Sequence, residues 1–381
     1  MITRKSGSRI GSHPKGVRSA QPIALAKLAS ALREVCLPAQ VSRPGMEFKR
    51  YVGAMRIFSL ATIFAVTTAL LPAQQLNIAA AAEYSDENAG LAILVYDDGK
   101  LVFEQYQNGH KQNKTQHIFS GTKSFAPMVA LIAQQEGLLQ LDEKVCETIT
   151  EWQGDDDREQ ITIRHLLNFT SGLKDIDDAL HSLQARDKYA ASIACTCVRT
   201  PGARFQYGSN HLMVFGELIK RKLAKASTKE QPMPKDFVAY LKDRVLEPIN
   251  CKFGAWLRDA KGNPALPYGA YMTAREWAKF GLLVLNRGKH GGKQIVPLEH
   301  FDECFMGTKA NPRYGLNFWL IGKRANRRNE AVPADTVTAA GMFNQKLYII
   351  PSRKLLVVRM GRTGARVRYN DTQFLNELFS E

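Results

Sequence analysis

The 381-residue sequence predicts an α/β protein in which an antiparallel sheet is built from both ends of the chain and a helical subdomain lies between them. Strand-like segments occur in pairs near each end, and helix-like apolar spacing fills most of the stretch between. The composition, 45% hydrophobic and 23% charged, is that of a folded protein and excludes a disordered chain. We expect the folded domain to cover residues 83–381, with the helical subdomain at about residues 124–335.

Two hairpins account for the strands that we expect. Residues 89–96 and 101–107 are rich in apolar residues, and the turn Asp97-Asp98-Gly99-Lys100 between them suits a tight hairpin. Residues 345–350 and 355–360 repeat this pattern around residues 351–354. Apolar spacing predicts helices at residues 124–136, 211–223, 274–286 and 372–379, and a further helix that begins at Ile163.

The first 82 residues are predicted to be a leader. They hold 11 Lys or Arg residues but only 2 Asp or Glu, and residues 57–71 form an apolar run behind three basic residues. With the small residues that follow, residues 46–82 have the organisation of a secretory signal peptide, cleaved at Ala73 or Ala82. The apolar run has 15 residues, fewer than the roughly 17–25 of a spanning helix, so a retained membrane anchor is the second interpretation. We expect residues 1–45 to be a non-native or disordered leader.

The charge distribution and the cysteine content limit which macromolecular partners and cofactors the sequence predicts. The net charge is +16, but the leader holds an excess of nine, and the +7 that remains is spread along the domain without a basic stripe. We therefore expect no nucleic-acid partner and at most a transient approach to a membrane or cell wall. The predicted signal peptide implies a periplasmic or secreted protein. Five cysteines fall within residues 83–381 without metal-ligand spacing, so we expect neither a metal nor a cofactor, and no disulfide pair is specified. Nothing in the sequence fixes the oligomeric state.

Ser120 and Lys123 form a Ser-x-x-Lys motif. On a helix, residues three apart share a face, so the amine of Lys123 can accept the proton of the Ser120 hydroxyl and make it a nucleophile. If Ser120 begins a helix, its own N–H is also a free donor for an oxyanion. The same motif occurs at Ser12 and Ser171, but only Ser120 lies between a predicted sheet and an apolar helix.

The segments around this motif resemble the serine β-lactamase and penicillin-binding protein superfamily. They are most similar to its class C-like branch, which includes family VIII esterases and 6-aminohexanoate-dimer hydrolases. The likeness runs from about Leu91 to Met360 in six ordered segments: HIFSGTKSF around Ser120, LLQLDEKV at 138–145, ITIRHLLNFTSGL at 161–173, PGARFQYGSNHLMVFGELI at 201–219, YMTAREWAKFGLLVLNRG at 271–288 and AAGMFNQKLYIIP at 339–351. The resemblance implies a β-lactamase-like α/β sandwich and an acyl-enzyme formed at Ser120.

The resemblance also implies roles for residues at the second family motif, Tyr-x-Asn. Tyr207 falls on the tyrosine and would relay protons between Ser120, Lys123 and the leaving group. Ser209 stands where the family has asparagine, a change similar to the aminohexanoate-dimer branch, and a shift of one residue would bring Asn210 there instead. We expect these residues to contact substrate, and Trp319 to line the same cleft.

The third family motif, Lys-Thr-Gly or His-x-Gly, corresponds to Ala339-Ala340-Gly341. The resemblance implies that Gly341 leaves room for substrate along a strand and that the Met342 N–H is the second oxyanion donor beside that of Ser120. Ala339 replaces the cation of the motif and cannot bind a substrate carboxylate, although Arg359 or another base is an open alternative.

These residues favour an exported hydrolase that acts on a small-molecule ester or amide. A β-lactamase or D-alanyl-D-alanine carboxypeptidase is the second interpretation, because the nucleophile and its two partners are intact. A catalytically silent exported binding protein is the third, supported by the missing cation and by Ser209.

Overall fold

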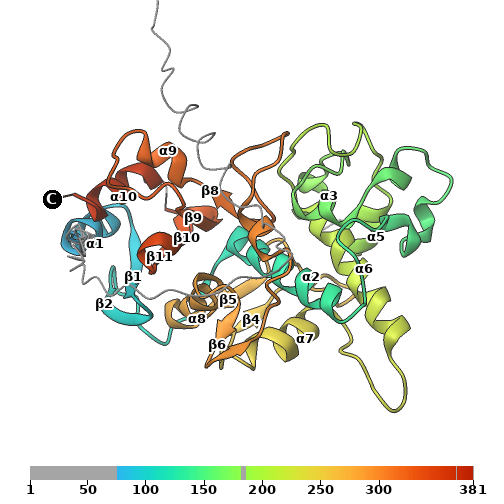
Figure 1. Ribbon diagram of the computed structural model, residues 1–381, viewed down its shortest axis with the longest axis horizontal. Helices are drawn as coiled ribbons and strands as arrows, with labels where there is room; N and C mark the ends of the chain where they lie inside the picture. The colour runs from blue at the N-terminus through green and yellow to red at the C-terminus, as the bar shows by residue number, and fades with distance from the viewer. Residues whose placement is uncertain (1–74, 182–185, 366, 381) are drawn as a thin grey trace, which may run out of the picture. The chain divides into compact units, whose positions relative to one another are not determined.

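The computed structural model describes residues 75–181, 186–365 and 367–380, and its centre is one antiparallel sheet of six strands (Figure 1). The strands lie in the order β2-β1-β11-β10-β9-β8. Their bounds are Gly90–Asp97 (β1), Lys100–Tyr106 (β2), Trp319–Leu320 (β8), Val337–Gly341 (β9), Gln345–Ile350 (β10) and Leu355–Gly361 (β11). Because β1 pairs with β11, the two ends of the chain meet inside the sheet, and this prediction is confirmed.

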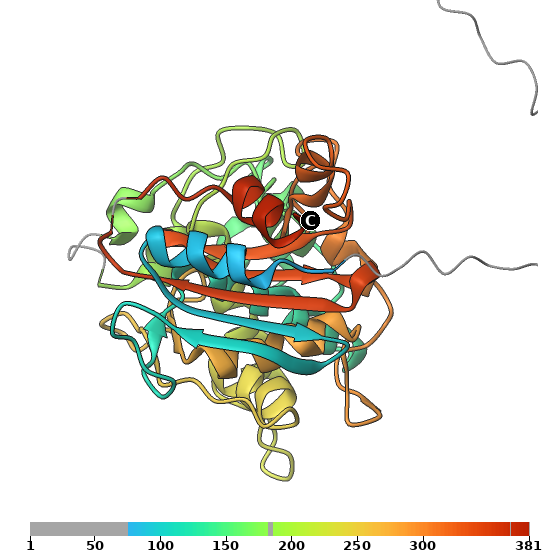
Figure 2. The ribbon, with the colours of Figure 1, turned by 90° about the vertical axis from the view of Figure 1, so that its left-hand side faces the viewer.

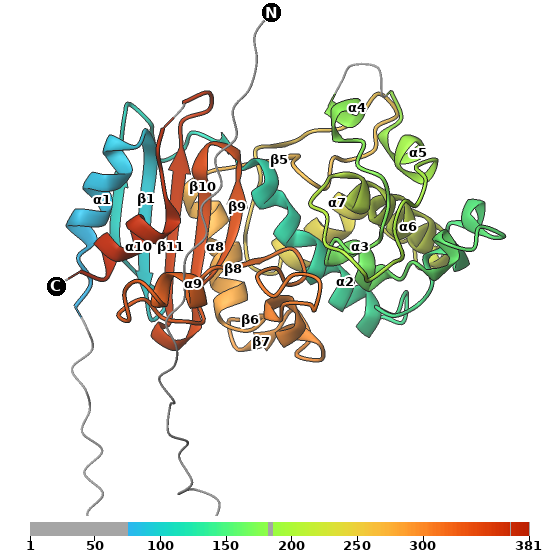
Figure 3. The same cartoon turned by 90° about the horizontal axis from the view of Figure 1, so that it is seen from above.

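Both faces of the inner strands β1, β10 and β11 are buried, because their side chains alternate between two hydrophobic cores. On β1, Leu94 belongs to one core, whereas Ile93 and Val95 belong to the other. The helices that cover the faces are Ile78–Glu87 (α1), Ala274–Leu285 (α8) and Asp371–Leu378 (α10). Figure 2 shows α1 and α10 on one face of the strands, and Figure 3 shows α8 on the other. Burial on two faces explains why β1 is a nearly continuous apolar run and why β11 is interrupted only by Arg359.

The helical part of the chain begins next to the sheet and lies on the opposite side of Figure 1 from α1. Its helices are Phe125–Gln135 (α2), Ile163–Leu167 (α3), Asp177–His181 (α4), Lys188–Ile193 (α5), Asn210–Ala226 (α6) and Phe237–Leu241 (α7). The expected limits of about 124–335 are too wide, since α8 packs on β10 and β11. The apolar face of α8 packs on the sheet rather than on other helices. This face includes the buried Phe280 and Leu283.

Short elements complete the described chain. A three-stranded sheet has the order β3-β5-β4, a two-stranded ribbon joins β6 to β7, and α9 precedes β9. Their bounds are Gln116–His117 (β3), Ala255–Trp256 (β4), Ala270–Met272 (β5), Lys289–His290 (β6), Lys293–Gln294 (β7) and Gly322–Asn326 (α9). The five cysteines in the described residues are all unpaired.

The N-terminal boundary of the domain differs from the predicted one. The helix α1 starts at Ile78, its N-cap Asn77 accepts a hydrogen bond from the Ala80 N–H at 3.1 Å, and Ala81 and Ala82 are buried. Residues 78–82 therefore belong to the domain, because they form the first half of α1 and Ala81 and Ala82 pack into its core. The apolar run of residues 57–71 and Ala73 lie outside the described residues. Within the described part, we find no helix with the length and hydropathy to cross a membrane.

We expect a chain that begins at Glu83 to be less stable than one that begins at Gln75. The shorter chain lacks the N-cap Asn77 and the buried Ala81 and Ala82, which should lower the free energy of unfolding by about 2 kcal/mol. Urea denaturation followed by circular dichroism measures the difference. Identical midpoints for the two chains would show that residues 75–82 add nothing to the domain.

Candidate active site

Ser120 and Lys123 lie in a short 3₁₀ helix, η1 (Phe119–Ser124), that leads directly into α2. A 3₁₀ helix has three residues per turn, so side chains at positions i and i+3 lie one above the other. Lys123 Nζ is accordingly 3.0 Å from Ser120 Oγ, a hydrogen-bond distance. Phe119 enters the turn with φ of 47°, a left-handed conformation that is rare for a bulky residue. The shared face was predicted correctly, but η1 replaces the first α-helical turn that we expected.

The side-chain nitrogen of Lys123 is enclosed by the protein. The residue is 3% exposed, and Nζ also donates to the carbonyl oxygen of Pro267 at 2.9 Å. The Tyr207 ring lies on a third side, with its centroid 4.9 Å from Nζ. Among the described residues, no carboxylate forms an ion pair with Lys123, so Ser120 Oγ is the side-chain oxygen that it meets. The structure thus brings the three predicted catalytic residues together.

Three aromatic rings hold Tyr207 in this position. Trp319 stacks on it, with ring centroids 5.5 Å apart and planes at 26°. Phe169 and Tyr314 contact the same ring edge-on, at centroid distances of 5.4 and 6.1 Å. Burial raises the pKa of Tyr314 well above its ordinary value, so this residue packs as a neutral ring. Trp319, which we expected to line the cleft, therefore helps to fix the position of the Tyr207 ring.

The backbone next to Tyr207 is fixed by His211 in the first turn of α6. His211 Nε2 lies 3.0 Å from the Gln206 carbonyl oxygen, and Nδ1 lies 2.8 Å from Ser171 Oγ. A neutral ring satisfies both contacts, because Nε2–H donates to the carbonyl and Nδ1 accepts from the hydroxyl. Burial lowers the pKa of His211 to about 4, which makes the neutral ring the form present near neutrality. Ser171, the other Ser-x-x-Lys serine of the domain, is thus a buried support of the Tyr207 loop.

Ser209 and Asn210, the two candidates for the third position of Tyr-x-Asn, are only 2% and 1% exposed. The N–H of Ser209 donates to Asp177 Oδ1 at 2.7 Å, which ties the Tyr207 loop to α4. Asn210 Nδ2 donates to the Lys174 carbonyl at 2.7 Å, and Oδ1 accepts from the His211 N–H at 3.1 Å. The Asn210 amide is thus hydrogen-bonded within the protein through both its nitrogen and its oxygen. Substrate contacts of Ser209 and Asn210 stay predictions.

Gly341 brings the end of β9 against the helix of the nucleophile. A Cβ atom at Gly341 would lie 2.1 Å from the Ile118 carbonyl oxygen, closer than a real side chain allows. Two residues further along, the rings of Phe119 and Phe343 are in contact, with centroids 5.3 Å apart. Ser120 and Met342 therefore lie at one junction between η1 and β9. That is where their N–H groups are predicted to form the oxyanion hole.

The strand β9 supplies no cation to this junction, since Ala339 and Ala340 precede Gly341. Arg359 was the alternative, and the structure contradicts it. Arg359 is fully buried beneath α1 and donates to the carbonyl oxygens of Asn88, at 2.6 Å, and Asn344, at 2.8 Å. Unpaired carbonyls at a helix C-terminus stabilise a cation, so Arg359 is held at the end of α1 and does not face a substrate.

Sequence reasoning missed Pro267 and Tyr268. Pro267 acts through its carbonyl oxygen, for which no side-chain pattern exists. The Tyr268 carbonyl is contacted by His117 Nε2, and the His117 ring stacks on Tyr271 with centroids 4.4 Å apart. Burial lowers the pKa of His117, in agreement with a structural rather than a catalytic histidine. Across the described residues, we find no group of three His, Cys, Asp or Glu that could hold a metal.

Comparison with known proteins relates the whole domain to one family. A family model described as Beta-lactamase matches residues 77–375. An uncharacterized protein of Alkalihalophilus pseudofirmus is 24% identical over 321 residues, which cover 74% of this chain and 87% of that protein. A solved structure from Bacillus anthracis, provisionally named a 6-aminohexanoate-dimer hydrolase, aligns with a TM-score of 0.63 and 20% identity over 78% of this chain and 79% of that chain. A family VIII carboxylesterase aligns with a TM-score of 0.58 and 14% identity over 80% and 97%. At these identities the two structures show a shared fold.

We expect the stability of a His211→Gln variant to depend less on pH than that of the wild type. His211 has a pKa of about 4 in the folded protein against 6.5 ordinarily, so between these values the unfolded chain binds a proton that the folded chain does not. Its contribution to stability is therefore complete above pH 6.5 and is lost as the pH falls through 4, by about 3 kcal/mol at most.

Urea unfolding of both proteins at pH 4, 5, 6 and 7 measures this difference. His290→Gln, at an exposed position on β6, is the matched control and should retain the wild-type profile. A His211→Gln profile with the full wild-type slope would contradict the account of this buried ring.

Proposed function

The chain belongs to the Beta-lactamase family and is a serine hydrolase of that fold, and on this premise we propose that Ser120 attacks an ester or amide and forms an acyl-enzyme. The observation that carries the proposal is the contact of 3.0 Å between Lys123 Nζ and Ser120 Oγ inside an enclosed site. The fold alone would not carry it, since one fold hosts many functions.

The reaction runs in two halves. First, the Ser120 hydroxyl proton passes to Lys123 Nζ while Oγ bonds to the carbonyl carbon, and the N–H groups of Ser120 and Met342 stabilise the oxyanion. The tetrahedral intermediate then expels the alcohol or amine, which takes a proton from Tyr207, and Lys123 returns its proton to Tyr207. In the second half, a water molecule gives a proton to the same pair while its oxygen attacks the acyl carbon. The bond from that carbon to Ser120 Oγ then breaks, Oγ takes the proton back from the pair, and the acid leaves.

The substrate that this site fits need not carry the carboxylate that the third family motif binds. Ala339 has no charge, and Arg359 is committed to α1 and to the turn at Asn344. The names of the two aligned structures, a carboxylesterase and a 6-aminohexanoate-dimer hydrolase, refer to ester and amide cleavage respectively, and both reactions follow the same steps. A small-molecule ester or amide is therefore the proposed substrate, ahead of a β-lactam.

Kinetics with p-nitrophenyl acetate, p-nitrophenyl butyrate and nitrocefin test the proposal. We expect ester turnover, with kcat lowered about 1,000-fold or more in Ser120→Ala and Lys123→Met and about 100-fold in Tyr207→Phe. Lys225→Met, near the last turn of α6, is the matched lysine control and should retain wild-type rates.

Two results would contradict the proposal. Ester turnover that survives in Ser120→Ala would remove Ser120 as nucleophile. Nitrocefin hydrolysis that exceeds ester hydrolysis would favour a β-lactamase, and the absence of any Ser120-dependent turnover would favour a silent binding protein.

We further propose that the protein is exported to the periplasm or secreted, through cleavage at Ala73 rather than at Ala82. A cut after Ala82 would divide α1, whereas a cut after Ala73 leaves its N-cap Asn77 in place. N-terminal sequencing of the protein from its native host should find a start just after residue 73. A start after residue 82, or a chain with an intact leader in the cytoplasm, would contradict this proposal.

A further inference from the structure

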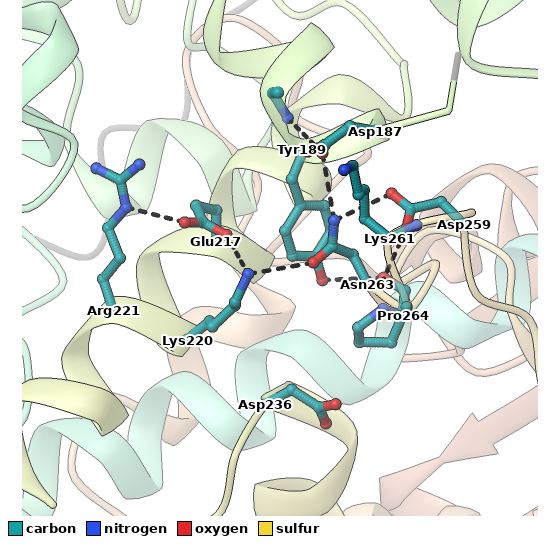
Figure 4. A network of polar contacts seen from close by, with 12 residues as sticks. Asp187, Tyr189, Glu217, Lys220, Arg221, Asp236, Asp259, Lys261, Asn263 and Pro264 are labelled. Atoms are coloured by element: carbon teal, nitrogen blue, oxygen red, sulfur yellow. Dashed lines mark hydrogen bonds and ion pairs between the residues drawn. The ribbon is translucent and has the colours of Figure 1, made fainter. Parts of the chain in front are cut away.

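A network of polar contacts fixes the start of α5 (Figure 4). Asp187 caps the helix, since its Oδ1 accepts from the Ala190 N–H at 3.0 Å, and the same oxygen accepts from Asn263 Nδ2 at 3.2 Å. The N–H of Lys188 donates to Asp259 Oδ2 at 2.9 Å. The loop that contains Asp259 and Asn263 is therefore bound to the first turn of α5.

Tyr189 holds the same turn against α6. Its hydroxyl donates to the Pro264 carbonyl at 2.9 Å, and a Cβ atom at Gly216 of α6 would lie 2.2 Å from that hydroxyl oxygen. Tyr189 is 2% exposed, so this contact is part of the core. The start of α5 thus has a defined position relative to Pro264, which lies four residues before Tyr268.

The side chain of Lys188 reaches from this fixed turn to Tyr268. Lys188 Nζ donates to Tyr268 Oη at 2.8 Å and lies 5.4 Å from the centroid of the ring. An ammonium has three donors, and this contact uses one. Within the described residues, the half-buried Lys188 forms no ion pair with a carboxylate. The Tyr268 hydroxyl therefore fixes the position of the Lys188 ammonium, and no carboxylate among the described residues is paired with it.

Tyr268 connects this ammonium to the Ser120 site. It directly follows Pro267, whose carbonyl oxygen accepts from Lys123 Nζ at 2.9 Å. The Tyr268 carbonyl is contacted by His117, which lies three residues before Ser120. The position of Tyr268 is consequently fixed from both the lysine and the nucleophile side of the site.

The helix α4 joins Tyr268 to the Tyr207 side of the site. At its start, Asp177 accepts from the N–H of Ser209, two residues after Tyr207. At its end, the His181 ring contacts the Tyr268 ring with centroids 4.8 Å apart. These contacts link the segments that carry Tyr207, α4 and Tyr268, and Lys188 contacts the last of them.

We infer that Lys188 binds an anionic group of the substrate, so that the hydrolase acts on esters or amides that carry a carboxylate away from the scissile bond. This inference rests on the proposed function and adds the substrate class to it. Lys123 is committed to Ser120 and Pro267, and β9 offers no charge, whereas Lys188 presents a preorganised ammonium. An ammonium–carboxylate hydrogen bond is of the strong, charge-assisted kind.

Two pairs of substrates test this inference, each an anion with a neutral analogue. For a charge on the acyl side, the pair is p-nitrophenyl hydrogen suberate and its primary amide. For a charge on the leaving-group side, the pair is the butyrate ester of 6-hydroxyhexanoic acid and its primary amide. The measured quantity is the ratio of kcat/KM for the anion to kcat/KM for the neutral analogue, in the wild type and in variants.

We expect the wild-type ratio to exceed one for one of the pairs and to fall about tenfold in Lys188→Met, mainly through a higher KM for the anion. Lys188→Arg should retain the preference. Lys225→Met removes a positive charge about 22 Å along α6 from its start and should keep the wild-type ratio. The pair that shows the preference identifies the side of the scissile bond that bears the charge.

A wild-type ratio of one or less for both pairs, or a ratio unchanged in Lys188→Met, would overturn the inference while leaving the proposed function intact. An equal fall for both members of a pair would show a purely structural Lys188 and would also overturn it. If neither the anions nor their neutral analogues show Ser120-dependent turnover, the proposed function fails, and calorimetry with the anion in the Ser120→Ala background decides. Weaker binding of the anion in Ser120→Ala/Lys188→Met than in Ser120→Ala supports the contact, and equal binding overturns it.

Discussion

The enclosure of Lys123 is the constraint on which the rest of this site depends. A lysine that is 3% exposed must find partners for its nitrogen inside the protein, and here they are Ser120 Oγ and the Pro267 carbonyl. Burying such a group without partners would cost several kcal/mol. The loop that contains Pro267 is therefore held in place, because moving its carbonyl away would leave the buried Lys123 nitrogen without one of its two partners. The same loop carries Tyr268, so the catalytic contact and the proposed anion contact share one support.

The sheet supplies the other fixed reference. Strands from the two ends of the chain pair in its centre, which places β9 beside η1 although more than 200 residues separate Ser120 from Gly341. Contact at this junction is close, because a glycine at 341 is needed to leave room for the Ile118 carbonyl. Arg359 stabilises the turn after Met342 by donating a hydrogen bond to the Asn344 carbonyl oxygen. The predicted oxyanion donors are thus placed by backbone packing, not by flexible side chains.

Sequence reasoning predicted what is encoded by local patterns. The hairpins around residues 97–100 and 351–354, the helices at 274–286 and 372–379, and the shared face of Ser120 and Lys123 follow from periodicity and turn chemistry, and the structure confirms them. Sequence reasoning could not predict Pro267, because this residue acts through its backbone carbonyl. It also could not predict whether the apolar face of α8 packs on the sheet or on other helices, because both surfaces are apolar. The alanine tract at 79–82 suits both a signal-peptide end and a helix packed on a sheet, and only the tertiary contacts of α1 separate the two.

The most direct measurement of the central claim is the rate at which a fluorophosphonate probe labels the protein, with the modified residue located by peptide mass spectrometry. The account predicts a single adduct on Ser120 that forms rapidly in the wild type and at least 100-fold more slowly, as an order of magnitude, in Lys123→Met. An adduct on another residue, or equal labelling rates in the two proteins, would contradict the claim that Lys123 activates Ser120.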